Sequence, residues 1–362
     1  MKFLFFLGHP AHFHLFKNIK SKLELDGHQT IVLIKSKDIL EQLCIESNQE
    51  YYNVLPQVRK GNLFSIGKSF LYKYKRIGKV IKSFKPDILL GSEPTLTHLG
   101  FFFKIPSFVF SEDDVEIIPQ FAKIAYPFVD VIISPNTCNA GRWDAKKIGY
   151  DGYHKLAYLH PSVFTPNRDL VSFLGDEKYF IIRLTNLQAY HDNDRQGISK
   201  NLLINLIELL EQRGKVFITS ERELDGEFEK YRLIINPMHI HHVLYYASLY
   251  IGDSQSMAVE ASLLGTPNIR FNDFAAEIGV LNELEEKYKL TVGIKTNNPE
   301  LLLETVNKML SESDLFKKTK DLAKAMLKDK INVPTFFVWF IENYPKSKKI
   351  MKVNPDYQNN FK

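Results

Sequence analysis

The sequence predicts an α/β protein made of two doubly wound domains, each with a parallel sheet. Short apolar runs alternate with segments of helical periodicity, which is typical of parallel strands joined by helices. The alternation breaks once, at residues 158–176, in a stretch that contains Pro161 and Pro166, and we place the domain boundary there. A chain of 362 residues is long enough for two domains of ordinary size.

The first domain is predicted to span residues 1–160. Its first strand is the apolar run 2–7, and the next segment has a helical apolar face made of Leu15, Phe16, Ile19 and Leu23. Gly27 ends this helix. Four more apolar runs are interpreted as strands, at 30–34, 88–90, 108–110 and 131–133. Helices between them should cover both faces of the sheet.

The second domain is predicted over residues 161–330, with strands at 179–184, 216–219, 233–235, 249–251 and 268–270. After it, the segment 331–345 is strongly apolar and contains a helix from 333 to 344. This helix either caps the second domain or packs back on the first. Residues 346–362 are expected to form a polar tail.

Composition and charge narrow the class of protein. The chain is 44% hydrophobic and 25% charged, with a formal net charge of +5. A mildly positive charge fits an anionic ligand and does not indicate a nucleic-acid partner. The two cysteines lack metal or redox spacing, and no apolar run reaches the roughly 20 residues of a membrane span. We therefore expect a cytoplasmic protein.

A basic amphipathic pattern lies between residues 68 and 82. Six basic side chains alternate there with aromatic and aliphatic ones. This pattern is compatible with peripheral contact at the inner face of a membrane. The alternative interpretation is a surface helix whose lysines are solvated.

The segment 249–267 carries the strongest functional pattern. A buried strand stops at a Gly-Asp-Ser turn, and a helix follows with Ser254 as its N-cap. Such a turn directs the backbone N–H groups near Gln255, Ser256 and Met257 at one point, where a phosphate can bind. Glu260, one helical turn on, can accept hydrogen bonds from sugar hydroxyls. The pattern predicts a nucleotide site, although an ordinary capped turn has the same sequence signature.

The loop after the first strand contains three histidines within six residues, His9, His12 and His14. A histidine at the end of a strand can take the proton of an attacking hydroxyl, because its ordinary pKa lies near neutrality. One histidine is expected to cap the helix and another to pack under the sheet. His12 is the first candidate for the catalytic base, and His14 is the second.

Acidic residues follow two other strands of the first domain. Glu93 comes after strand 88–90 and Asp113 after strand 108–110. A carboxylate there can orient His12, bind acceptor hydroxyls or act as the base. The acids at 112–116 can equally be a charge cluster at the start of a helix. Neither this cluster nor the histidines at 239, 241 and 242 have the spacing of a metal site, so no metal is predicted.

Cationic and hydroxyl side chains follow two strands of the second domain. Arg183 ends one strand, and Ser220 and Arg222 follow the next. Together they can neutralise a diphosphate leaving group. The alternative is that both arginines pair with nearby acids such as Glu221 or Asp192.

Three stretches together, 12–17, 157–161 and 246–261, resemble the DUF354 family, which is regarded as glycosyltransferase-like. The Gly-Asp-Ser turn also resembles GT-B glycosyltransferases and UDP-N-acetylglucosamine 2-epimerases. Those families have Gly-Gly where this chain has Gln255-Ser256. The resemblance implies a GT-B architecture, with two Rossmann-like domains facing each other across a cleft and a C-terminal helix crossing back. It also implies that the loop with His239 frames the nucleotide base.

The resemblance implies an inverting, metal-independent glycosyltransferase of polysaccharide or glycoconjugate synthesis. It would need no cofactor and would use a nucleotide sugar, a UDP-sugar above all, with a glycan or glycolipid acceptor. One alternative is a non-hydrolysing UDP-sugar 2-epimerase, although the His-Arg-x-Glu-Asn run of such enzymes is absent from the sequence. The other is an inactive sugar-nucleotide-binding protein. No P-loop sequence is present, which argues against a nucleotide hydrolase.

Overall fold

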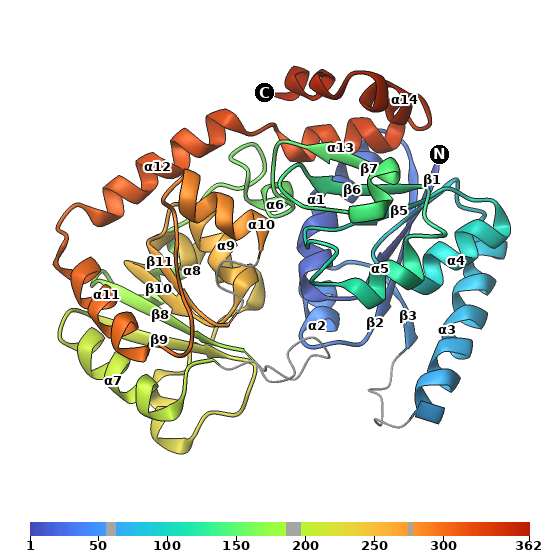
Figure 1. The fold of residues 1–362 in the computed structure, drawn as a ribbon. Helices are drawn as coiled ribbons and strands as arrows, with labels where there is room; N and C mark the ends of the chain where they lie inside the picture. The colour runs from blue at the N-terminus through green and yellow to red at the C-terminus, as the bar shows by residue number, and fades with distance from the viewer. Residues whose placement is uncertain (56–62, 186–196, 274–277) are drawn as a thin grey trace. The chain divides into compact units, whose positions relative to one another are not determined.

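The computed structural model describes residues 1–55, 63–185, 197–273 and 278–362, with the backbone alone for 63–69. The chain divides into two compact units (Figure 1). The first unit is Met1–Val163 together with Lys330–Lys362, and the second is Phe164–Asp329.

The first unit contains a seven-stranded sheet, and every pair of neighbouring strands is parallel. Its order is β3-β2-β1-β4-β5-β6-β7. The strands are β1 (Lys2–Leu7), β2 (Gln29–Lys35), β3 (Tyr52–Leu55), β4 (Ile88–Leu90), β5 (Ser107–Phe110), β6 (Val131–Pro135) and β7 (Lys147–Tyr150). The predicted parallel sheet is confirmed, and the sequence analysis missed β3 and β7.

Successive side chains of β1 serve the two faces of this sheet, as the strand geometry requires. Leu4 and Phe6 pack with α3 (Leu63–Phe84) and α4 (Pro94–Phe103). Phe5 packs against Phe16 of α1 (Pro10–Leu25) on the opposite face, and Phe16 contacts Phe110 of β5. Since both faces are covered, β1 is apolar throughout its buried length. The shorter helices of the unit are α2 (Leu40–Glu46), α5 (Pro119–Ala125) and α6 (Leu156–Leu159).

The apolar segment after residue 330 forms α13 (Val333–Glu342) and belongs to the first unit. Phe337 contacts Phe110, and Phe340 contacts Phe108, so α13 packs on the same face of the sheet as α1. Residues 346–362, expected as a polar tail, are folded. They form α14 (Lys346–Val353) and a final 3₁₀ segment (Pro355–Phe361), in which Tyr357 stacks on Trp339. This folded segment gave no clear sequence signal, because Tyr357 and Phe361, which pack on Trp339, are separated by polar residues.

The second unit contains a five-stranded parallel sheet in the order β12-β11-β10-β8-β9. Its strands are β8 (Tyr179–Leu184), β9 (Lys215–Ser220), β10 (Leu249–Gly252), β11 (Asn268–Phe271) and β12 (Val292–Ile294). Its helices are α7 (Lys200–Glu211), α8 (Ile240–Tyr246), α9 (Gln255–Leu263), α10 (Gly279–Asn282), α11 (Pro299–Ser311) and α12 (Leu315–Asp329). The strand expected at 233–235 does not form. Only a single bridge joins Arg232 to Ile218, and β12 takes the place of a fifth strand.

Each sheet reverses its winding direction once. In the first unit the reversal lies between β1 and β4, and in the second it lies between β8 and β10. At such a point the loops after the two central strands diverge and leave a crevice at the carboxyl ends, where ligands of doubly wound folds bind. The fold therefore directs attention to the loops after β1, β4, β8 and β10.

Candidate functional site

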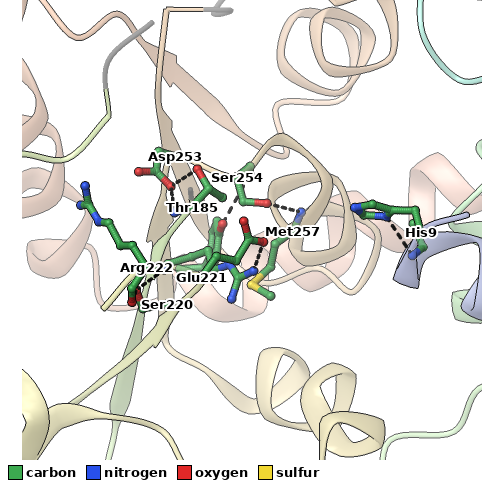
Figure 2. Close-up of polar contacts among 11 residues, drawn as sticks. His9, Thr185, Ser220, Glu221, Arg222, Asp253, Ser254 and Met257 are labelled. Carbon is green, nitrogen blue, oxygen red and sulfur yellow. Dashed lines mark hydrogen bonds and ion pairs between the residues drawn. The ribbon is translucent and has the colours of Figure 1, made fainter. Parts of the chain in front are cut away.

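The turn from β10 to α9 forms the predicted capped helix start. Ser254 has extended backbone angles, and its Oγ accepts a hydrogen bond from the N–H of Met257 at 3.3 Å (Figure 2). The N–H groups of Gln255 and Ser256 come before the first helical hydrogen bonds and so have no acceptor within the helix. Ser256 is exposed and Gln255 is half-buried. This end of α9 can therefore donate two backbone hydrogen bonds to an anion.

Asp253 fixes this turn to the neighbouring strand. Its Oδ1 accepts hydrogen bonds from the N–H and Oγ1 of Thr185, at 2.7 and 2.9 Å (Figure 2). Burial raises the pKa of the Asp253 carboxyl, and the bonds from Thr185 offset this only in part. The backbone of Gly197 lies so close that a Cβ there would come 2.4 Å from Oδ2 of Asp253. Asp253 thus holds the loops after β8 and β10 together at the point of reversal.

Glu260 lies on the buried side of α9. Its Oε1 is 3.3 Å from Nε2 of His241 on α8, and both side chains are nearly inaccessible. The carboxylate predicted to bind sugar hydroxyls is therefore already engaged with a neighbouring helix.

The arginines at the strand ends are both engaged within the unit. Arg183 forms an ion pair with Glu221, as the alternative interpretation proposed. Nη2 of Arg222 donates to the carbonyl of Ile198 at 2.7 Å. Ser220 Oγ accepts from the N–H of Arg222 and donates to its carbonyl, which closes a tight loop after β9 (Figure 2).

Two further histidines of the second unit lie at the start of α8. His239 is the residue before the helix and is half-buried, and its ring lies 6.3 Å from that of His242. Nδ1 of His242 accepts a hydrogen bond from the N–H of Asn167 at 3.1 Å. Asp192, named above as an alternative partner of Arg183, lies outside the described residues.

In the first unit, two histidines hold the start of α1. Nδ1 of His9 accepts from the N–H of Ala11 at 3.2 Å, and Nδ1 of His12 accepts from the N–H of Gly8 at 3.1 Å. A backbone N–H can only donate, so Nδ1 of each ring carries no proton. Each neutral ring therefore carries its hydrogen on Nε2.

The surroundings keep these two rings neutral. Burial is the largest cause of the lowered pKa of each ring. Among the nearby lysines, Lys37 has the largest effect on the pKa of His9 and Lys35 has the largest effect on that of His12. Both pKa values fall from 6.5 to about 3. In this state Nε2 of His12 donates a hydrogen bond and cannot accept a proton. The geometry thus favours a hydrogen-bond donor where the sequence analysis predicted a base.

His14 and Glu93 lie in the interior. The His14 ring is 7% exposed and packs 5.3 Å from the ring of Tyr158, which favours a packing role. Glu93 forms a buried ion pair with Lys73, and its Oε2 lies 3.6 Å from Nζ of Lys35. Burial alone would raise the pKa of Glu93, but the two lysines outweigh it and hold the pKa below its ordinary value. Glu93 is therefore a poor proton acceptor.

Among the acids after β5, Asp113 and Glu116 are exposed, and Asp113 lies closer to the strand end. Glu112 pairs with Lys155 and accepts from the N–H of His154 at 2.7 Å. Asp114 accepts from the N–H of Asn139 at 2.6 Å. Of the predicted catalytic carboxylates, Asp113 is thus the one that a ligand can reach.

His9 is the histidine that caps the helix, a role expected for one of the three without saying which, whereas Asp253, Thr185 and Lys35 were not predicted as site residues. The signal for His9 was present, because Pro10 follows it and proline is favoured at the first position of a helix. Within residues 1–55, 63–185, 197–273 and 278–362, no group of three His, Cys, Asp or Glu side chains is placed to hold a metal ion. In the same part of the chain, no helix is long and apolar enough to cross a membrane.

Comparison with known proteins places the chain among its relatives. The family described as "Protein of unknown function (DUF354)" matches residues 4–330. The chain belongs to the DUF354 family. The predicted membership is confirmed. None of the curated protein sequences compared with this DUF354 protein matches it.

Solved structures of two enzyme classes share the fold. UDP-GlcNAc 2-epimerase from Neisseria meningitidis, bound to UDP-GlcNAc, has a TM-score of 0.65 and 16% identity, over 91% of this chain and 99% of that one. UDP-GlcNAc 2-epimerase from Methanocaldococcus jannaschii has a TM-score of 0.61 and 14% identity, over 91% of this chain and 100% of that one. Spinosyn rhamnosyltransferase SpnG, complexed with spinosyn aglycone, has a TM-score of 0.62 and 13% identity, over 95% and 100%. These similarities confirm the predicted GT-B fold of two Rossmann-like units.

Proposed function

We propose that this DUF354 protein is an inverting glycosyltransferase that uses a nucleotide sugar, with UDP as its leaving group. The observation that carries the proposal is the start of α9. Two backbone N–H groups emerge there at the reversal point of the sheet, beside a turn that Asp253 fixes to Thr185. A diphosphate satisfies both N–H groups and the positive end of the helix. UDP is supported by the UDP-GlcNAc named for one structure of the same fold.

The second unit would stabilise the leaving group. As the acceptor oxygen attacks the anomeric carbon, the bond from that carbon to the diphosphate breaks and its electron pair leaves with UDP. Charge then grows on the diphosphate, where fixed N–H donors and a nearby cation are most effective. Arg183 is partly exposed beside Glu221 and can exchange that partner for a phosphate.

The first unit would bind the acceptor. Nε2–H of His12 donates to an oxygen of the acceptor or sugar, and the exposed carboxylate of Asp113 takes the proton of the attacking hydroxyl. This assignment moves the proton-accepting role from His12 to Asp113 and keeps both residues in the site. The acceptor is a glycan or glycolipid, in polysaccharide or glycoconjugate synthesis. No metal ion or other cofactor enters the reaction.

One experiment separates the proposal from its alternatives. The protein is incubated with a panel of nucleotide sugars in D₂O, with and without a mixture of glycan and glycolipid acceptors. A transferase releases UDP only when an acceptor is present and leaves C2 of the sugar unlabelled. A 2-epimerase incorporates deuterium at C2 without any acceptor, which would overturn the proposal. Tight binding without either reaction would identify an inactive binding protein.

A further inference from the structure

Three helices, α3, α4 and α5, cover one face of the sheet in the first unit, and α4 packs against both of the others (Figure 1). Together these helices contain seven lysines and arginines and no aspartate or glutamate. Since the whole chain has a formal charge of +5, the remaining residues carry a net charge of −2. Lys73 is buried in an ion pair with Glu93, and the other six basic residues give this layer, which we call the α3–α5 layer, a net positive charge.

The same layer exposes large apolar side chains. Phe101 and Phe102, in the last turn of α4, are 66% and 75% exposed, and Leu71 of α3 is 73% exposed. An open groove of about 460 Å³ runs between the helices. Its described lining is almost entirely apolar and consists of Tyr74, His98, Leu99, Phe101, Phe102 and Phe128. Large exposed apolar side chains grouped around a groove are typical of an interaction site.

The floor of the groove is held in place by hydrogen bonds. Nε2 of His98 donates to the carbonyl of Ile124 at 2.8 Å, so the Tyr74 hydroxyl donates to its Nδ1. The His98 ring lies 4.6 Å from Phe128, and Phe101 lies 5.4 Å from Phe128. These contacts join α3, α4 and α5 beneath the exposed rings. The surface is therefore a built feature of the unit.

Exposed lysines occur close in sequence to the groove residues of all three helical segments. Lys75 follows Tyr74, Lys104 follows α4, and Lys123 precedes Ile124, and all three lysines are exposed. Nζ of Lys82 lies 5.9 Å from the ring centre of Phe103. Exposed lysines are thus present in the same helical segments as the groove residues.

We propose that the α3–α5 layer docks on a lipid bilayer that contains anionic headgroups. A protein partner would favour a surface depleted of lysine, whereas this one is rich in it. A soluble polyanion would bind the lysines but would leave the rings of Phe101 and Phe102 exposed to water. A bilayer uses both, because the rings enter the boundary of the acyl chains and the lysines meet the headgroups. Docking on a bilayer does not depend on the proposed transfer reaction.

Vesicle flotation of the full-length protein tests the proposal. Vesicles of phosphatidylcholine mixed with phosphatidylglycerol are compared with vesicles of phosphatidylcholine alone. We expect at least about tenfold tighter binding to the mixture, because each lysine near an anionic surface strengthens binding roughly fivefold. The double variant Phe101→Ser/Phe102→Ser and the double variant Lys75→Glu/Lys123→Glu should each lose at least about tenfold in affinity for the mixture.

Matched controls come from exposed positions of the second unit. Phe173→Ser and the double variant Lys308→Glu/Lys317→Glu make the same kinds of substitution, at one phenylalanine and at two lysines, and should bind as the wild type does. Equal binding to both kinds of vesicle, or no loss in either patch variant, would overturn the proposal. The proposal would also be overturned if the protein formed an oligomer that the phenylalanine variant dissociates and the lysine variant does not. That result would mean that a second copy of the chain covers the α3–α5 layer. Binding to soluble heparin that only the lysine variant weakens, without flotation, would identify a polyanion.

Discussion

Replacing His12 with glutamine and with alanine separates a hydrogen-bond donor from a base. The Nδ1 atom of His12 accepts from the N–H of Gly8, so the hydrogen of the neutral ring is on Nε2. Glutamine can place an N–H₂ group close to the position of Nε2, and alanine cannot. Glutamine has no basic nitrogen, so neither variant can act as a base.

The magnitude follows from the pKa of the ring, which burial and the neighbouring Lys35 lower from 6.5 to about 3. At about 1.4 kcal/mol per pKa unit, forming the imidazolium is disfavoured by roughly 5 kcal/mol relative to an ordinary histidine. General-base catalysis contributes about 10²–10⁴-fold, or roughly 3–5 kcal/mol. The cost of protonating His12 would therefore cancel most of the rate enhancement that it could give as a general base. A donor role contributes about 1–3 kcal/mol.

We therefore expect His12→Ala to lower acceptor-dependent UDP release by about 10–100-fold and His12→Gln to recover most of that loss. Asp113→Asn, which removes the proposed proton acceptor, should lower it by about 10²–10⁴-fold. Nitrogen NMR of the labelled ring should show Nε2 protonated and Nδ1 unprotonated from neutral pH down to about pH 5. Equal loss in both His12 variants, with Asp113→Asn still active, would refute this reasoning and return the base role to His12.

The remaining predictions concern stability in acid, the role of Glu260 in nucleotide-sugar binding and the need for a metal ion. Burial lowers the pKa values of His9 and His12 to about 3 and that of His154 to about 4, so below about pH 6.5 the unfolded chain binds more protons than the folded one. The free energy of unfolding should therefore fall by about 2 kcal/mol per histidine between about pH 8 and about pH 5. Urea denaturation at the two pH values measures this fall, and equal free energies would contradict it. Glu260→Ala should weaken nucleotide-sugar binding by about 1–3 kcal/mol in calorimetry, with Glu260→Gln as the control that keeps a partner for His241. A chelator should leave turnover unchanged, and loss restored by magnesium or manganese would disprove metal independence.

The elements that the sequence predicted best are those defined by local pattern. The strands β1, β8 and β10 are central strands covered on both faces, so their buried side chains are apolar, and the charged residues Lys2 and Arg183 lie near strand ends. The edge strands β3 and β12 are short and partly exposed, which explains why they lacked a clear signal. The N-cap at Ser254 was predictable because capping depends on residues close in sequence.

The partners of the site residues were not predictable, because they depend on how distant elements pack. Glu260 meets His241 from another helix, and Glu93 meets Lys73 twenty residues earlier in the chain. The proton position on His12 depends on the direction of a single backbone N–H, that of Gly8. Sequence patterns therefore identified where chemistry is concentrated at the strand ends, and the packing determined which groups are available for it.

The central claim is that the backbone at the start of α9 binds the diphosphate, and replacing Gln255 with proline tests it most directly. Proline is favoured at the first position of a helix, and Ser254 already has the extended backbone angles that a residue before proline requires. Gln255→Pro thus removes one N–H while keeping the helix, and Gln255→Ala removes the side chain while keeping the N–H. In calorimetry with UDP, we expect proline to weaken binding at least about tenfold more than alanine does. Equal affinities for the two variants, both of them folded, would contradict it.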